Sequence, residues 1–363
     1  MTKQEVQLLI GACHKDGKKA AVSFCSHIPQ EILEAAGIHL LRLPHISDAK
    51  DSASRILPKN VCPIVKKCCD ICEDASLAAA DLVLAETSCD GKKKMYELLS
   101  NQDRVYFYQV AQGVDRDYTK PLIKSECTYL VKELKKRFDI EITEDAIRDA
   151  GKLINQERES VVKLMEIQRQ VPPPALGGEI FQALESHRSI LDTEKRITAN
   201  NQIREKLLTK ESLVKKRAKR LLVTGCPLNG AYNKIINAVE DNGGVVVCFE
   251  NCEVMKSAVR HFDPSNPDVF DALADCYQNT ACAIMAPNAL RFELLRQLAT
   301  DYQVDGIVDV TLQTCHAYTC ERDKMSRFCE DELEIPYMPV ETDLSDADVG
   351  QLGTRIAAFV EML

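Results

Sequence analysis

Residues 80–99 read ADLVLAETSCDGKKKMYELL and contain the pattern that decides the fold. The apolar run at residues 82–85 predicts a buried strand, and the segment that follows Cys89 predicts a helix. Strands that alternate with helices in this way form parallel sheets with both faces covered. Cys89 therefore lies where a strand ends and a helix begins, and Lys92, Lys93 and Lys94 follow it. A helix amino terminus and nearby lysines are expected to lower the pKa of this thiol and to favour the thiolate.

The same alternation occurs in two parts of the chain. The apolar runs of strand length lie at 20–25, 38–43, 81–86 and 104–110, and again at 219–226, 243–250, 305–313 and 335–341. Between them, a charged region with helical periodicity is interrupted by the prolines at 172–174. We expect an α/β protein with two Rossmann-like domains that contain parallel sheets, at 1–140 and 219–363, joined by a helical connecting region at 141–218.

The composition limits the classes of molecule that the protein is expected to bind. The chain has 363 residues, with 45% hydrophobic and 28% charged residues, which is enough for two domains with their own cores. Its net charge of -9 argues against nucleic acid as a partner, because phosphate binding needs a basic surface. No apolar run approaches the roughly 20 residues of a membrane span. The first twenty residues lack the apolar core of a signal peptide, so we expect a cytoplasmic protein.

The sixteen cysteines are the most unusual feature of the composition. In a large protein of a reducing compartment, an excess of cysteine points to metal or redox chemistry rather than disulfides. Cys127, Cys248 and Cys276 lie inside apolar runs, where free cysteine packs as a small hydrophobic residue. Other cysteines follow predicted strands. Because ligands bind beyond the carboxyl ends of parallel strands, cysteines far apart in the sequence can meet there, and thiolates hold iron.

The two halves also resemble each other in their cysteines. Each half has a first cysteine at the end of its opening strand and a third cysteine after a later strand. The intervals between cysteines differ, so an insertion is expected between the second and third cysteines of the second half. We infer an internal duplication. The two triplets are Cys25, Cys62 and Cys89, and Cys226, Cys252 and Cys315.

Other chemistries find less support. Cys69 and Cys72 form a CxxC with Cys68 beside it, but no second pair completes a zinc site, and the flanks are not those of a thioredoxin-like turn. No nucleophile elbow or G-x-G-x-x-G motif follows a strand. His27 and His316 lie beside candidate ligands, where they are candidates for proton or hydrogen-bond donors to a cluster. A packing or surface role is an equal interpretation for both.

Several segments together resemble a known superfamily. They are FCSHIPQEILEAAGIHLLRL, LPKNVCPIVKK, ADLVLAETSCDGKKKMYELL, VTGCPLNG, FENCEVMK, VDGIVDVTLQTCHAYTCE and the carboxyl-terminal ETDLSDADVGQLGTRIAAFVEML. Along essentially the whole chain, these segments are similar to the 2-hydroxyacyl-CoA dehydratase and benzoyl-CoA reductase superfamily. Within it they look most like the double-cubane cluster proteins. The cysteine-rich KKCCDICEDAS that follows Cys62 departs from the pattern expected there.

This resemblance implies an iron–sulfur centre in the cleft between two Rossmann-like domains. In the double-cubane branch, two 4Fe-4S cubanes are joined by a bridging sulfide (8Fe-9S), with three cysteine ligands each. Cys282 also falls where the family has a cysteine, and it ranks after the others. The implied ligands are Cys25, Cys62, Cys89, Cys226, Cys252 and Cys315.

The resemblance also implies a function and partners. An ATP-dependent reductase (activator ATPase) would supply low-potential electrons, a small-molecule substrate would be reduced, and the chain would form a homodimer. The lysines at 92–94 would tune the cluster or steer the docking partner, unless they are only the solvated start of a helix. The alternative is a dehydratase or benzoyl-CoA reductase subunit that acts on an acyl-CoA with a single 4Fe-4S cluster. A third interpretation is a non-catalytic cluster carrier or assembly scaffold.

Overall fold

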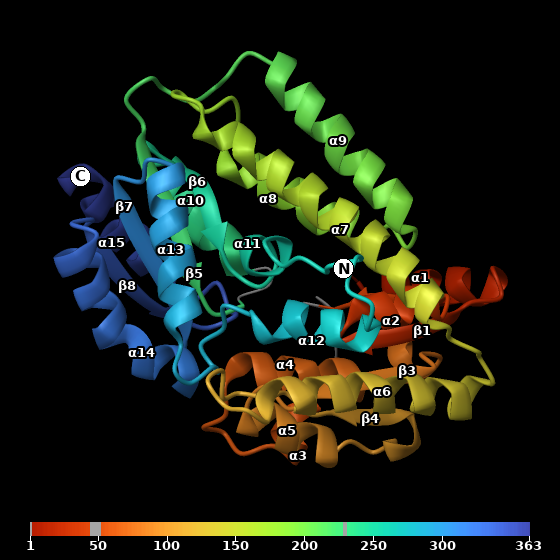
Figure 1. The fold of residues 1–363 in the computed structure, drawn as a ribbon. Coiled ribbons are helices and arrows are strands. Elements are labelled where there is room, and N and C mark those ends of the chain that lie inside the picture. The colour runs from red at the N-terminus through yellow and green to blue at the C-terminus, as the bar shows by residue number, and fades with distance from the viewer. Residues whose placement is uncertain (1, 44–51, 228–230) are drawn as a thin grey trace.

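The computed structural model describes residues 2–43, 52–227 and 231–363, and in this part the chain forms two four-stranded parallel sheets (Figure 1). The first sheet has the order β2-β1-β3-β4 and the second has the order β6-β5-β7-β8. The predicted α/β class with two parallel sheets is therefore confirmed. The strands are β1 (Lys19–Ser23), β2 (Ile38–Arg42), β3 (Leu82–Glu86), β4 (Val105–Tyr108), β5 (Lys219–Gly225), β6 (Gly244–Glu250), β7 (Gly306–Leu312) and β8 (Tyr337–Thr342).

Both sheets have the same strand order, which is the arrangement that an internal duplication would produce. The residues of β3, β6 and β7 are all buried, because helices cover both faces of parallel sheets. The helices before the connecting region are α1 (Lys3–Lys15), α2 (Gln30–Ala35), α3 (Ala53–Ile56), α4 (Pro63–Cys72), α5 (Asp90–Glu97) and α6 (Thr119–Phe138). Those after it are α10 (Tyr232–Glu240), α11 (Met255–Ala258), α12 (Val269–Gln278), α13 (Ala289–Asp301), α14 (His316–Arg327) and α15 (Val349–Met362).

The connecting region is helical, with the break that its prolines predict. It consists of α7 (Glu144–Glu166), α8 (Gly177–His187) and α9 (Thr193–Thr209), and the prolines at 172–174 lie between α7 and α8. Helices α7 and α9 lie side by side (Figure 1). None of the helices in the described ranges combines the length and the apolar character that crossing a membrane requires.

Helix α12 belongs to the second half of the sequence but packs against the first. It lies beside α6 in Figure 1, and the Lys120 ammonium forms an ion pair of 2.7 Å with Asp271. Apolar residues of α12 share a core with those of β3 and α6. This helix lies between Cys252 and Cys315, where the cysteine intervals predict an insertion. The domain limits at 140 and 218 stay a prediction. Helix α12 follows residue 218 in the sequence but packs against α6, which precedes residue 140.

A buried polar cluster joins α2, α7 and α12. The Arg158 guanidinium donates to Glu31 Oε1 at 2.7 Å, and the Tyr277 hydroxyl donates to Glu31 Oε2 at 2.8 Å. All three residues are at most 5% exposed. Although burial opposes ionisation, Arg158 and Tyr277 hold the pKa of Glu31 below its ordinary value. The cluster therefore fixes helices that come from three separate parts of the sequence.

Replacing Tyr277 by Phe is expected to lower the free energy of unfolding by about 1–3 kcal/mol, because it removes a buried hydrogen bond to a carboxylate. Folding favours the ionised form of Glu31, whose pKa is lowered, so its contribution is fully present above pH ~4.5 and is lost as the pH falls through the folded-state pKa. Urea unfolding at several pH values measures both effects. The exposed Tyr118→Phe is the control, and a Tyr277→Phe variant as stable as the parent at pH 7 would contradict the assignment.

Candidate functional site

A cavity of about 820 Å³ lies at the carboxyl ends of strands from both sheets. Eight cysteines line this cavity, which we call the thiol cavity. All six cysteines named as candidate ligands are among them, so residues separated by up to 290 positions in the sequence share one space. The eight are Cys25, Cys62, Cys68, Cys89, Cys226, Cys252, Cys282 and Cys315.

The sheet topology explains why four of these cysteines meet. Cys25 and Cys89 follow β1 and β3, which are neighbours in the first sheet, and Cys226 and Cys315 follow the neighbouring strands β5 and β7. In both sheets, the strand order reverses between these two strands. Such a switch point opens a crevice beyond the carboxyl ends of the strands, where open α/β sheets bind their ligands.

The remaining candidates come from loops and helix starts. Cys252 follows β6, and Cys282 lies between α12 and α13. Cys62 is the residue before α4 and occupies its N-cap position, as Cys89 does for α5 and Cys315 for α14. Cys282, which ranked last in the sequence, therefore lines the same cavity as the six.

Three of the thiols are close enough to interact directly across the two halves. The Cys226 side chain raises the pKa of the Cys315 thiol and the Cys62 side chain lowers it, so these three side chains lie close together. The Leu312 amide donates to Cys226 Sγ at 3.0 Å. Cys226 reaches this place because Gly225 has a φ of 124°, and a Cβ at this glycine would lie 1.9 Å from the Val310 carbonyl oxygen. Only glycine permits that close approach of β5 to β7.

A second set of thiols interacts through electrostatics. Burial raises the pKa of Cys25 to about 12, and among the smaller effects the Cys252 thiol raises it too. Burial also raises the pKa of Cys252 to about 12, with Cys282 adding to the increase. Cys25 belongs to the first half, whereas Cys252 and Cys282 belong to the second. Each of the two sets therefore contains thiols from both halves of the chain.

The prediction of a lowered pKa at Cys89 was wrong. Burial raises the pKa of this thiol, and the opposing effects of the Lys92 ammonium and the Lys92 amide are smaller. In the metal-free protein the thiols of Cys25, Cys89 and Cys252 are therefore protonated at neutral pH. A bound metal would have to displace these protons, as metals that coordinate cysteine do.

The three lysines after Cys89 differ in environment. Lys92 is 6% exposed, and its ammonium pairs with Glu86 Oε1 at 2.6 Å and donates to the Phe24 carbonyl at 2.9 Å. Lys93 and Lys94 lie toward solvent and pair with Asp90 and Glu97 within their own helix. Lys92 therefore belongs to the wall of the thiol cavity, which it lines, and is not a surface contact for a partner.

The spacing of the donors suits a cluster better than a single ion. Across the described ranges, no group of three or more His, Cys, Asp or Glu side chains is close enough to hold one metal ion. A single zinc needs four ligands around one point, whereas a cluster spreads its irons and so takes thiolates from all sides of a larger space. Eight cysteines around one cavity fit the second case, and thiolates are the ligands that iron–sulfur clusters take.

The other cysteines and the two histidines divide between cavity and core. The CxxC lies inside α4, where Cys68 lines the thiol cavity while Cys69 and Cys72 are buried beside it. Cys127, Cys248 and Cys276 are buried core residues, as predicted. His316 lines the cavity, but His27 does not. Burial, Arg260 and Lys92 lower the pKa of His27 to about 3, so its ring is neutral.

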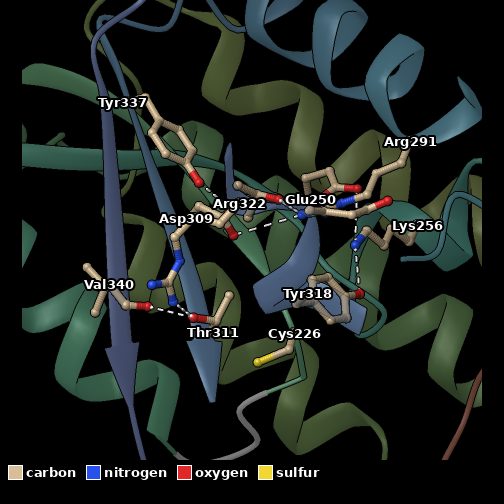
Figure 2. A network of polar contacts seen from close by, with 12 residues as sticks. Cys226, Glu250, Lys256, Arg291, Asp309, Thr311, Tyr318, Arg322, Tyr337 and Val340 are labelled. Carbon is tan, nitrogen blue, oxygen red and sulfur yellow. Dashed lines mark hydrogen bonds and ion pairs between the residues drawn. The ribbon is translucent and has the colours of Figure 1, made fainter. Parts of the chain in front are cut away.

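Sequence analysis missed a buried charge network in the second half of the chain (Figure 2). The Lys256 ammonium lies 3.2 Å from Glu250 Oε1 and donates to the Tyr318 hydroxyl at 3.0 Å, and Tyr318 lines the thiol cavity. Arg291 is 0% exposed and pairs with Glu321 Oε2 at 2.6 Å. The available signal was Asp309, a carboxylate inside the apolar run of β7, because a buried charge needs a partner.

The comparisons with known proteins cover most of the chain. The family model for the 2-hydroxyglutaryl-CoA dehydratase D-component matches residues 25–363. The "Putative dehydratase subunit YjiM" of Escherichia coli K12 is 39% identical over 349 residues, which are 94% of this chain and 90% of that protein.

Two further relatives are more distant. The (R)-phenyllactyl-CoA dehydratase beta subunit of Clostridium sporogenes is 19% identical over 96% of this chain and 92% of its own length. A benzoyl-CoA reductase subunit of Thauera aromatica is 24% identical over 73% of this chain and 65% of its own length.

Proposed function

The chain belongs to the 2-hydroxyglutaryl-CoA dehydratase D-component family, and from this premise we propose that it is the iron–sulfur component of a reductase. In this proposal, an ATP-hydrolysing reductase partner supplies low-potential electrons, and a small-molecule substrate is reduced in the thiol cavity. The observation that carries the proposal is the set of eight cysteines around one cavity, drawn from both halves of the chain. The homodimer and the cytoplasmic location belong to the same proposal.

The proposed cofactor is the double-cubane 8Fe-9S cluster. Its ligands would be Cys25, Cys62, Cys89, Cys226, Cys252 and Cys315, with Cys282 as the seventh candidate. When bound, the cluster would accept single electrons and deliver them at low potential. The two interacting sets of thiols, around Cys315 and around Cys252, support two cubanes better than one, and the second set contains Cys282 where the six ligands contain Cys89. In this arrangement, each cubane would take ligands from both halves of the chain.

The protein's own residues would prepare the cavity for this chemistry. Apolar side chains such as Val65 and Leu312 line it together with the thiols and limit the access of water. Lys92 and Lys256 place buried ammonium groups near the thiols, where positive charge stabilises thiolates. Any electrostatic steering of the ATPase by the lysine run would fall to Lys93 and Lys94, since Lys92 is buried.

The second candidate function follows from the names of the relatives. Two of them are described as dehydratase subunits and one as a benzoyl-CoA reductase subunit. On this alternative, the chain is a subunit that holds one 4Fe-4S cluster, works with a paralogous subunit and acts on an acyl-CoA thioester. A single cluster with three or four cysteine ligands would leave five or four of the eight cavity thiols without iron, and for this reason we favour the double cubane.

Iron analysis of the full chain, purified without oxygen, separates the two candidates. We expect about eight irons per chain, because two cubanes contain that number, with acid-labile sulfide in similar amount. About four irons per chain would contradict the double cubane and support the single-cluster subunit. A full complement of iron without turnover, when a low-potential ATP-dependent reductase is supplied, would support a cluster carrier instead.

A further inference from the structure

The wall of the thiol cavity contains one arginine whose charge has no carboxylate partner in the described ranges. Arg42 ends β2 and lines the cavity, and its Nη2 donates to the amide oxygen of Gln30 at 2.8 Å. Its Nε is buried and has no hydrogen-bond partner. A guanidinium has five N–H donors and favours planar acidic partners, so most of its binding capacity is unused.

The other cavity arginines are different, because each has a carboxylate. Arg158 pairs with Glu31 at 2.7 Å, Arg188 with Glu185 at 2.6 Å and Arg196 with Glu157 at 2.6 Å. The acidic groups nearest to this wall are also engaged: Glu157 binds Arg196, and Glu34 accepts a hydrogen bond from Thr193 at 2.8 Å. Among the described residues, Arg42 therefore has no carboxylate bound to it, although the charge of Glu157 acts on it electrostatically.

The surroundings of Arg42 contain further positive charge. Burial, together with the guanidinium groups of Arg260 and Arg188, lowers its pKa to about 10, although Tyr277 and Glu157 oppose this decrease. Arg260 stacks on the Tyr277 ring at 4.8 Å and donates to the Ser26 carbonyl at 2.7 Å, and no described residue forms an ion pair with it. At neutral pH, Arg42 remains charged. Arg42 is partly buried, and its buried Nε is a donor that an anion in the cavity would satisfy.

The position of Arg42 relates it to the thiols. Arg42 is the register partner of Ser23 at the end of β1, and Cys25 lies two residues beyond Ser23. Both strands end at the edge where the thiol cavity opens. A molecule held by an acidic group at Arg42 would therefore extend along a wall that contains Cys25.

We infer that Arg42 is the anchor for an acidic group, a carboxylate or a phosphate, of the molecule that occupies the thiol cavity. Calling this molecule the substrate rests on the proposed function, whereas the binding of the anion does not. Charge-assisted hydrogen bonds from a guanidinium to such groups are among the strongest in proteins, and they are often bidentate.

Calorimetric titration of the full chain, purified without oxygen, tests the inference. The probes are inorganic phosphate and succinate, which distinguish a phosphate from a carboxylate as the source of the anion. At least one of them is expected to bind saturably, and Arg42→Met is expected to weaken this binding about tenfold or more. Arg42→Lys keeps the positive charge but loses the planar guanidinium, so its affinity for the anion should lie between that of the parent and that of Arg42→Met. Lys93→Met removes one surface charge and should bind as the parent does.

Two further measurements separate the anchor from a structural role. Arg42→Met should keep the iron content of the parent, so a failure of the cluster proposal would not be mistaken for a failure here. Its unfolding temperature without anion should equal or exceed that of the parent, because a partly buried charge that has no carboxylate partner among the described residues has been removed. Absence of saturable binding by both probes would overturn the inference. Unchanged binding in Arg42→Met, or a variant that does not fold, would overturn it as well.

Discussion

Cys315→Ser is expected to purify with most of its iron missing and to lose reductase-dependent turnover by at least about 100-fold. Loss of a residue that only supports a metal ligand already costs about 10–100-fold in metal affinity or activity, and a ligand should cost no less. Cys315 is the best position for the test because its thiol interacts with both Cys62 and Cys226. Serine is nearly the same size as cysteine, so the change removes the soft sulfur donor with little effect on packing.

Two control variants make this result specific to the thiol cavity. Cys320→Ser changes an exposed cysteine five residues further along the same helix, α14. Cys276→Ser changes a buried cysteine that does not line the cavity. Both controls should keep the iron content of the parent, as measured by metal analysis and low-temperature paramagnetic resonance. If Cys315→Ser retained as much iron as these controls, Cys315 would not be a ligand.

The sequence predicted the sheets well because apolar runs bounded by polar residues identify buried strands. The run at 81–86, for example, became β3 (Leu82–Glu86), and the run at 243–250 became β6. The packing of α12 on α6 was not predictable in the same way. Its apolar stripe shows that the helix is buried on one side, but the stripe does not identify the surface that covers it. The surface that covers the stripe is indicated only by complementary charges such as those of Lys120 and Asp271, which are 151 positions apart in the sequence.

The convergence of the cysteines was predictable from topology, whereas their electrostatics were not. A rule about the carboxyl ends of parallel strands was sufficient to bring Cys25, Cys89, Cys226 and Cys315 together. The pKa of Cys89 depends instead on the balance between burial and the Lys92 charge, and burial is not visible in local sequence. Lys92 itself stands in a run of three lysines that looks solvated. Its partner Glu86 closes the preceding strand and faces the same interior.

Arg291→Met is expected to lower the free energy of unfolding by about 3–5 kcal/mol, which is the cost of removing one partner from a buried ion pair. The Arg291 guanidinium lies 3.8 Å from Glu250 and 3.9 Å from Asp309, and Figure 2 shows these three side chains together. The guanidinium also pairs with Glu321 at 2.6 Å and donates to the Thr224 hydroxyl at 3.1 Å. Methionine fills much of the same volume but carries no charge. Lys256 would then be the one cation left beside Glu250 among the described residues.

Urea unfolding of Arg291→Met and of Arg296→Met measures the difference within one helix. Arg296 also lies in α13, but it is 40% exposed and pairs with Glu332 at 2.7 Å at the surface, so its removal should cost about 0–1 kcal/mol. The network continues from Arg291 through Glu250 and Lys256 to Tyr318 in the cavity wall. If both variants unfolded at the same urea concentration, the buried network would add no stability beyond that of a surface ion pair, and its role would have to be sought in the chemistry of the cavity.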